Sequence, residues 1–218
     1  MWNPAIRLLR QRNASASVSS TDEAFTLIEL MVVLLILAIL LAIAIPTFLG
    51  VTKSANDRAA QSNLNTAVQD AKTVFQQNGQ TYSLTTNATY TTPTAVLAAT
   101  LSSIEPNLGF STTAVTSGSS QSQTPQQVSV AVAADGNGIV IAAQAKGTAN
   151  CWFVINNGAP ESATASTPYA NLSGAALNAG TAFGEAKGAS TCNAATPPAV
   201  SASTTAPVTY TASNFPNL

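Results

Sequence analysis

A long apolar run near the amino terminus constrains this chain more than any other feature. Residues 25–45 read FTLIELMVVLLILAILLAIAI and contain one charged residue, Glu29. As an α-helix this 21-residue segment is about 31 Å long, which matches the hydrocarbon core of a bilayer. Arg7, Arg10 and Arg12 precede it, so we expect the leader to stay cytoplasmic and the remainder to be exported. The run therefore predicts a single-pass membrane helix.

The helical pattern continues beyond the apolar run but becomes amphipathic. Over residues 46–79, apolar side chains recur at spacings of three and four, whereas polar residues from Asp57 to Asp70 fall mostly off that stripe. The stripe consists of Ala60, Leu64, Ala67, Val68, Ala71, Val74 and Phe75. Pro46 is expected to kink the helix without ending it, and Asn78-Gly79 is a plausible stop. We expect the stripe to pack under the downstream domain.

Residues 80–192 have the pattern of a small head with a β-sheet. Residues 94–103 predict a short helix. Alternating valines at 128–132, a Gly-rich turn and the apolar residues 139–143 predict a β-hairpin, and 151–155 predicts a third strand. With the helix before it, this head predicts an α+β fold, in which a long amino-terminal helix packs on a small antiparallel sheet.

The last part of the chain is rich in small and polar residues. Residues 160–192 predict a loop, and residues 193–218 predict a Thr/Ser/Pro-rich tail that is either extended or lies along an edge of the sheet. Cys151 and Cys192 both lie on the exported side, where an even count indicates a disulfide; two unrelated buried thiols are the alternative. A bond across this loop would stabilise the head by roughly 4 kcal/mol.

The composition argues against catalysis and against nucleic-acid binding. Charged residues make up 8% of the chain and the net charge is −1, so there is no basic footprint for nucleic acid. The chain has no His, the commonest general base and metal ligand. The acidic residues beyond the leader are scattered singly: Glu29, Asp57, Asp70, Glu105, Asp135, Glu161 and Glu185. We therefore predict that the chain is not an enzyme and has no catalytic residue, metal site or cofactor.

The motif Phe25-Thr-Leu-Ile-Glu-Leu30 runs straight into the apolar helix. With the polar leader 1–24 before it and Pro46 after it, the motif resembles the class III signal of type IV prepilins and type II secretion pseudopilins. The resemblance covers residues 22–78, and the layout of helix, hairpin and two cysteines more loosely resembles actinobacterial type IV pilins. The pilin fold is what this resemblance implies.

The resemblance also implies a processing pathway. A prepilin peptidase, a dedicated membrane aspartyl protease, would cut between Ala24 and Phe25 on the cytoplasmic face and N-methylate the new amine of Phe25. Most family members carry Gly before the cut, whereas this chain carries Ala24, and Asp22-Glu23 stand where basic residues are more usual. The mature subunit would then leave the cytoplasmic membrane and join a homo-oligomeric filament on the cell surface.

Glu29 is the one charged residue of the apolar segment, and the resemblance also gives this position a role. A charged carboxylate in hydrocarbon costs about 2.5–3.5 kcal/mol and favours finding a partner. In the family, the matching Glu pairs with the amine of a neighbouring subunit, which here implies that Glu29 binds Phe25 of the next chain and sets the assembly register. The residues alone leave a second reading open, because Thr26 and Glu29 have the spacing of a capping box. Both can hold, in the free and the assembled states.

Assembly would need other proteins. No phosphate-binding glycine loop is present that could power extraction from the membrane. The resemblance implies that a cytoplasmic assembly ATPase and a membrane platform protein supply the energy for extraction.

Two other functions stay open. A pseudopilin or minor pilin of a type II secretion or DNA-uptake machine would share the same helix, although residues 193–218 lack the acidic residues of a carboxy-terminal calcium loop. A secreted binding domain with an ordinary signal peptide, cut after Ala42-Ile-Ala44, would begin at Ile45. The first residue of the exported protein distinguishes the two kinds of processing: Phe25 indicates prepilin cleavage, and Ile45 indicates an ordinary signal peptide.

Overall fold

The computed structural model describes residues 25–113, 115–116, 126–161, 168–169, 172, 174–189, 191–199 and 208–215. The predicted leader, including Ala24, lies outside these residues. The elements in chain order are α1 (Leu27–Gln77), α2 (Pro93–Ile104), β1 (Gly109–Ser111), β2 (Val115–Thr116), β3 (Gln127–Val132), β4 (Gly138–Gln144), β5 (Cys151–Asn157), η1 (Gly174–Leu177), β6 (Gly180–Ala186), β7 (Thr191–Cys192) and β8 (Val208–Thr211). The chain divides into two compact units between Ile45 and Pro46.

Helix α1 is continuous over 51 residues and retains Pro46 in its interior. Its end is defined by Gly79, whose φ of 70° is a left-handed conformation that glycine adopts without strain. The Gln80 N–H donates to the Phe75 carbonyl at 2.9 Å across this turn, as in a Schellman cap. The predicted helix and its stop at Asn78-Gly79 are therefore confirmed, whereas a kink at Pro46 stays a prediction.

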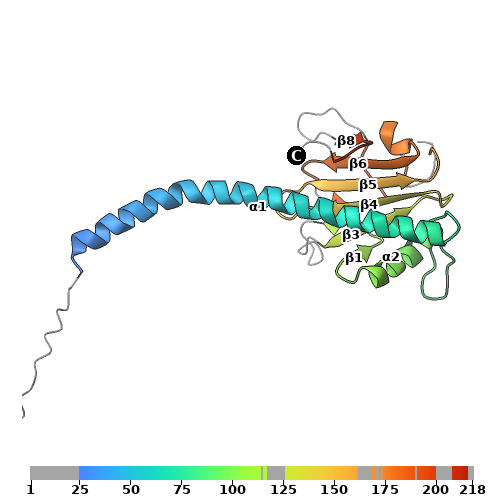
Figure 1. Cartoon of the computed structure of the whole chain (residues 1–218), viewed down its shortest axis with the longest axis horizontal. Coiled ribbons are helices and arrows are strands. Elements are labelled where there is room, and N and C mark those ends of the chain that lie inside the picture. The colour runs from blue at the N-terminus through green and yellow to red at the C-terminus, as the bar shows by residue number, and fades with distance from the viewer. Residues whose placement is uncertain are drawn as a thin grey trace, which may run out of the picture. The chain divides into compact units, whose positions relative to one another are not determined.

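The main sheet has six strands in the order β1-β3-β4-β5-β6-β8 (Figure 1). Strands β2 and β7 form a second, two-stranded sheet. The predicted hairpin is confirmed, since β3 pairs antiparallel with β4 and Val130 lies opposite Ile141. Strand β5 confirms the third predicted strand and extends it to Asn157. One pairing departs from the expected antiparallel sheet, because β1 lies parallel to β3.

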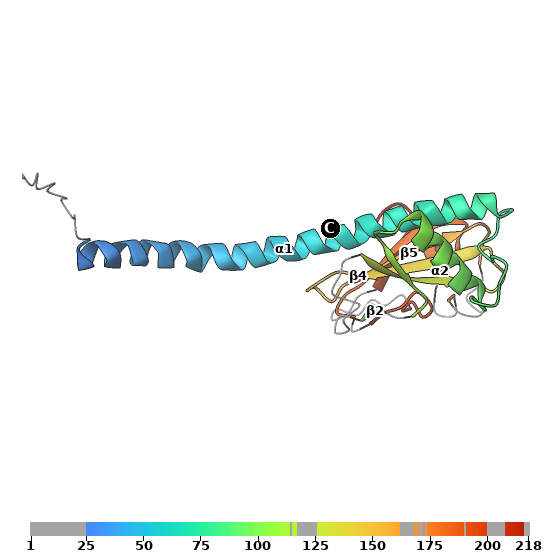
Figure 2. The same ribbon diagram turned by 90° about the horizontal axis from the view of Figure 1, so that it is seen from below.

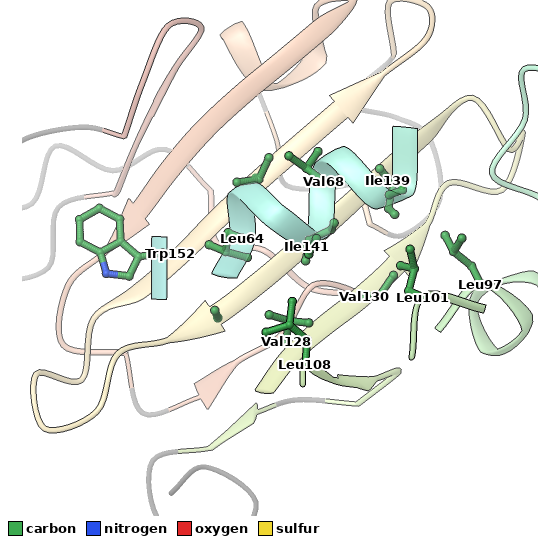
Figure 3. Packing of buried hydrophobic residues seen from close by; sticks show 14 of the residues in the cluster. Leu64, Val68, Leu97, Leu101, Leu108, Val128, Val130, Ile139, Ile141 and Trp152 are labelled. Atoms are coloured by element: carbon green, nitrogen blue, oxygen red, sulfur yellow. The ribbon is translucent and has the colours of Figure 1, made fainter. Parts of the chain in front are cut away.

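One face of the sheet packs against the second part of α1. The apolar stripe is confirmed: Ala60, Leu64, Ala67 and Ala71 are fully buried. Figure 3 shows Leu64 and Val68 lying over Ile141 and Ile139 of β4, in the cluster that also contains Val130 of β3. This contact joins helix and sheet into the predicted α+β head.

The other face of the sheet is covered as well. Phe153 and Ile155 belong to a second buried cluster, together with Tyr169, Leu172 and Cys192 from the segments after β5. Figure 2 shows β2, which pairs with β7, on the side of the head away from α1. Because both faces are covered, all residues of β4 and β5 are buried rather than alternating between buried and exposed.

The expectation of a loop over residues 160–192 is wrong in part. Strand β6 lies inside this stretch and pairs with β5 over its whole length, from Asn157 opposite Gly180 to Cys151 opposite Ala186. Its sequence, GTAFGEA, has one large apolar residue and two glycines, which predict a strand poorly. Pairing with the fully buried β5 decides its conformation instead.

The chain returns to the sheet near its carboxy terminus. Strand β8 pairs with β6 at the edge of the sheet, which corresponds to the edge segment among the two alternatives for the tail. Beyond it, the ring of Phe215 packs edge-on against Trp152 and Phe183, with centroids 5.6 and 4.8 Å away. This end of the described chain is therefore part of the helix-facing core.

Candidate functional site

The first turn of α1 is capped by Thr26. Its Oγ1 accepts the Glu29 N–H at 3.3 Å, and its carbonyl accepts the Leu30 N–H at 3.2 Å. Only half of a capping box is present, because the Glu29 carboxylate makes no hydrogen bond or ion pair within the described residues. The carboxylate is therefore open to a partner from another molecule.

The helix that follows presents apolar side chains all round. Between Leu27 and Ile45 the large apolar side chains are 46–76% exposed, and Phe25 is 78% exposed. Among the residues that the structure describes, α1 is the one helix long and apolar enough to cross a membrane. Such a surface is stable only against lipid or against other apolar protein surfaces.

In the second unit, a buried carboxylate fastens α1 to the sheet. Asp57 is 9% exposed, and its Oδ1 accepts hydrogen bonds from Thr148 Oγ1 at 3.0 Å and Trp152 Nε1 at 3.1 Å. The Asn150 side-chain amide lies 3.2 Å from both carboxylate oxygens. Four bonds from neutral donors thus replace water around the charge, and no cation pairs with it in the described part of the chain.

The helical pattern does not predict the burial of Asp57. Asp57 and Gln61 were expected off the apolar stripe, and this is wrong, because both are buried. Their spacing carried the signal: Asp57, Gln61 and Leu64 follow one another at intervals of four and three residues and so share one helix face. The charge is tolerated there because donors remote in sequence, in the β4–β5 turn and at the start of β5, bind it.

A second buried carboxylate lies close to Asp57. Glu185 of β6 is 4% exposed and lies opposite Trp152 on β5. Burial raises the pKa of Glu185; the Lys187 ammonium, 3.9 Å away, lowers it in part, and Asp57 raises it further. The head therefore holds two carboxylates near each other with one exposed cation beside them.

Asp57→Asn is expected to destabilise the head by about 1–2 kcal/mol. The amide keeps one acceptor oxygen but loses the charge that strengthens four hydrogen bonds and replaces the second acceptor with a donor. Urea unfolding of the exported protein measures the loss. Arg58→Gln, at the exposed neighbouring position, is the control and should change stability by less than about 0.5 kcal/mol. Equal stability of both variants would contradict an anchoring role.

The stability of the head is expected to fall as the pH rises from about 4.5 through the raised pKa of Glu185. The folded state holds this proton more tightly than the unfolded chain, so its contribution is complete at low pH and is lost on ionisation. Burial raises the pKa of Asp70 and Glu161 in the same direction.

Two substitutions test this pH dependence with opposite signs. Glu185→Gln should make the decline shallower, whereas Lys187→Gln should make it steeper, because the lysine lowers the pKa of Glu185. Thermal unfolding between pH 4 and 8 measures both slopes. An identical slope in both variants would contradict the assignment to Glu185.

The other predicted site residues are distributed over both units. Phe25 and Glu29 lie in the first unit, Pro46 begins the second, and Cys151 and Cys192 form the predicted disulfide, with Cα atoms 5.4 Å apart. Within the described ranges no group of three or more acidic, His or Cys side chains could hold a metal ion.

The fold and the amino-terminal segment together define a class of protein, in which an apolar signal helix continues into an α+β head. A family model described as the prokaryotic N-terminal methylation motif matches residues 20–45. The type IV wide pilus major component PilA4 of Thermus thermophilus is 38% identical over 87 residues, which cover 40% of this chain and 60% of that relative. No solved structure matches the chain. The amino-terminal segment thus matches a methylation motif, and part of the chain is similar to a type IV pilus component, of whose length the chain spans less than two thirds.

Proposed function

We propose that this chain is a structural subunit of an extracellular type IV pilus, and not an enzyme. The observation that carries the proposal is the exposed apolar segment 25–45. It lies within the match to a methylation motif, and its one charged residue, Glu29, has no partner within the described chain. The name of the Thermus relative, a major pilus component, favours a pilus over a pseudopilin.

Processing creates the second half of the assembly site. A prepilin peptidase would cut after Ala24 and leave a methylated amine on Phe25, four residues before Glu29. Methylation converts this primary amine into a secondary amine, which still carries a positive charge when protonated. Each mature subunit then carries one cation and one anion at the start of an apolar helix, and the two signs can pair between neighbouring copies.

We place the pairing between molecules because the Glu29 carboxylate has no partner within the described residues of its own chain. Phe25 precedes the first turn, while Glu29 lies in that turn with its N–H bound to Thr26. A neighbouring copy shifted along the helix axis can place its amine against Glu29, which removes the cost of an isolated charge in an apolar core. This contact would set the axial register of the filament.

The apolar helix would serve in two environments. In the cytoplasmic membrane its side chains face lipid, and in the filament the same side chains face identical helices, so transfer between the two does not expose them to water. A kink at Pro46 would adjust the helix between its two halves. A cytoplasmic ATPase and a membrane platform protein would supply the energy for extraction.

The amino terminus of surface material tests the proposal. Filaments sheared from cells that produce this chain should contain a protein that begins at methylated Phe25, as measured by intact mass and N-terminal sequencing. A protein that begins at Ile45 would instead identify a secreted domain. Correct processing without long surface filaments in electron micrographs would identify a pseudopilin or a minor subunit.

A further inference from the structure

Four of the five cations beyond the leader gather at one end of the head. Lys146 lies in the β4–β5 turn, and Lys187 follows β6 at the same end of the sheet. The Asn56 amide donates to the Lys146 carbonyl at 2.8 Å, which brings this turn to α1 within one helical turn of Lys53 and Arg58. All four cationic side chains are exposed. We call this set of four residues the basic end.

The basic end is poorly neutralised. Within the described residues, one of its cations forms an ion pair, that of Lys187 with Glu185 at 3.9 Å. The two carboxylates of this end, Asp57 and Glu185, are buried, and neutral donors already bind Asp57. The exposed surface at this end is therefore positive.

The opposite end of the same strands is negative. Asp135 lies exposed in the β3–β4 turn, and Glu161 follows β5 by four residues. The Gly158 N–H donates to the Asn137 carbonyl at 2.8 Å and holds the two segments together. Asp135 is close enough to raise the pKa of Glu161, although burial is the larger cause. We call Asp135 and Glu161 the acidic end.

The acidic end also lacks a counter-charge. No described cation forms an ion pair with Asp135 or Glu161. The two carboxyl groups share a side-chain hydrogen bond, and Glu161 Oε1 is buried without a hydrogen-bond partner. Lys72, the fifth cation, instead donates to Thr181 Oγ1 at 2.7 Å. Strand β4 begins beside the acidic end and finishes at the basic end, about 20 Å away.

We propose that the basic end of one head binds the acidic end of another copy of this chain, head to tail along the filament. This inference rests on the proposed function, because subunits with parallel helices present opposite ends of their heads to one another. A head-to-tail contact is heterologous and repeats without closing, as a filament requires. An anionic membrane would satisfy the basic end alone and leave the acidic end without a partner.

A charge swap tests the contact in the full chain. Lys146→Glu and Glu161→Lys should each lower the yield of sheared filaments, normalised to membrane-held subunit, by roughly fivefold, because each places like charges together. The double variant, which keeps the wild-type net charge, should return to within about twofold of the wild-type yield. Lys146 is exposed but Glu161 is half-buried, so Asp135→Lys, at the exposed acidic position, is made alongside Glu161→Lys and should lower the yield in the same way.

Lys72→Glu is the matched control, since it changes the net charge as Lys146→Glu does but lies outside the basic end. It should leave the yield of sheared filaments near wild type.

A double variant whose yield is no better than that of the worse single variant would overturn the contact. So would a Lys146→Glu variant that loses binding to phosphatidylglycerol vesicles and is not rescued by Glu161→Lys, which would assign the basic end to lipid. Wild-type yield in both single variants would refute this inference alone, whereas absence of filaments from wild-type cells would refute the proposed function.

Discussion

Glu29→Ala is expected to abolish filaments while membrane insertion stays intact. The variant removes the carboxylate that would pair with the Phe25 amine of a neighbouring subunit, and that amine is then left charged in an apolar core. An unpaired charge there costs about 3 kcal/mol, or roughly a hundredfold in the association constant of each contact. Insertion should not suffer, because the substitution makes the helix more apolar. Filament yield and membrane-held subunit are measured in the same cells.

Two further variants separate charge from helix capping. Glu29→Gln keeps the length and polarity of the side chain but not its charge, and should fail almost as completely as the alanine variant. Glu29→Asp keeps the charge on a shorter side chain and should retain part of the yield. Thr26 continues to cap α1 in all three variants through its bond to the backbone of residue 29. Filaments at the wild-type level from Glu29→Ala or Glu29→Gln would contradict the pairing.

Loss of the disulfide is expected to have the largest effect on the stability of the head. The bond joins Cys151 of β5 to Cys192 of β7, 41 positions apart, and both side chains are fully buried. Loop-closure entropy puts its contribution at roughly 4 kcal/mol, a large part of the 5–15 kcal/mol typical of a folded domain. Replacing both cysteines with alanine should lower the free energy of unfolding by about that amount, as measured in urea.

Reduction of the wild-type protein provides the control for side-chain packing. If loop closure is the main term, unfolding in the presence of a reductant should show most of the loss found in the double alanine variant. The alanine variant should add only a small term for the missing sulfur atoms. An unchanged unfolding midpoint in either experiment would show that the bond contributes little.

Much of the architecture follows from local sequence signals. The apolar stripe from Ala60 to Val74 has helical spacing, and Gly79 supplies the left-handed conformation that ends α1. The valines of β3 alternate before a Gly-rich turn, which specifies the hairpin with β4. In each case the residues that decide the element lie within a few positions of one another.

Other features depended on contacts between distant segments. Strand β6 has a weak local pattern and forms because β5 offers it a complete row of hydrogen-bonding partners. Asp57 is buried because Thr148, Asn150 and Trp152, more than 90 positions away, donate to it. A charged residue is predicted to be exposed unless its hydrogen-bond donors are known. The donors to Asp57 lie outside its own helix, so the pattern of that helix could not predict its burial.

Hydrophobicity and helical spacing act locally, so the residues alone specify the apolar segment 25–45, which lies within the methylation-motif match, and its single charge at Glu29. Which carboxylates are buried depends instead on packing between distant segments, and so does the separation of the remaining charges, with Lys146 at one end of the strands and Asp135 at the other. Strand pairing sets those positions, since it brings turns that are far apart in the chain to a common end of the sheet.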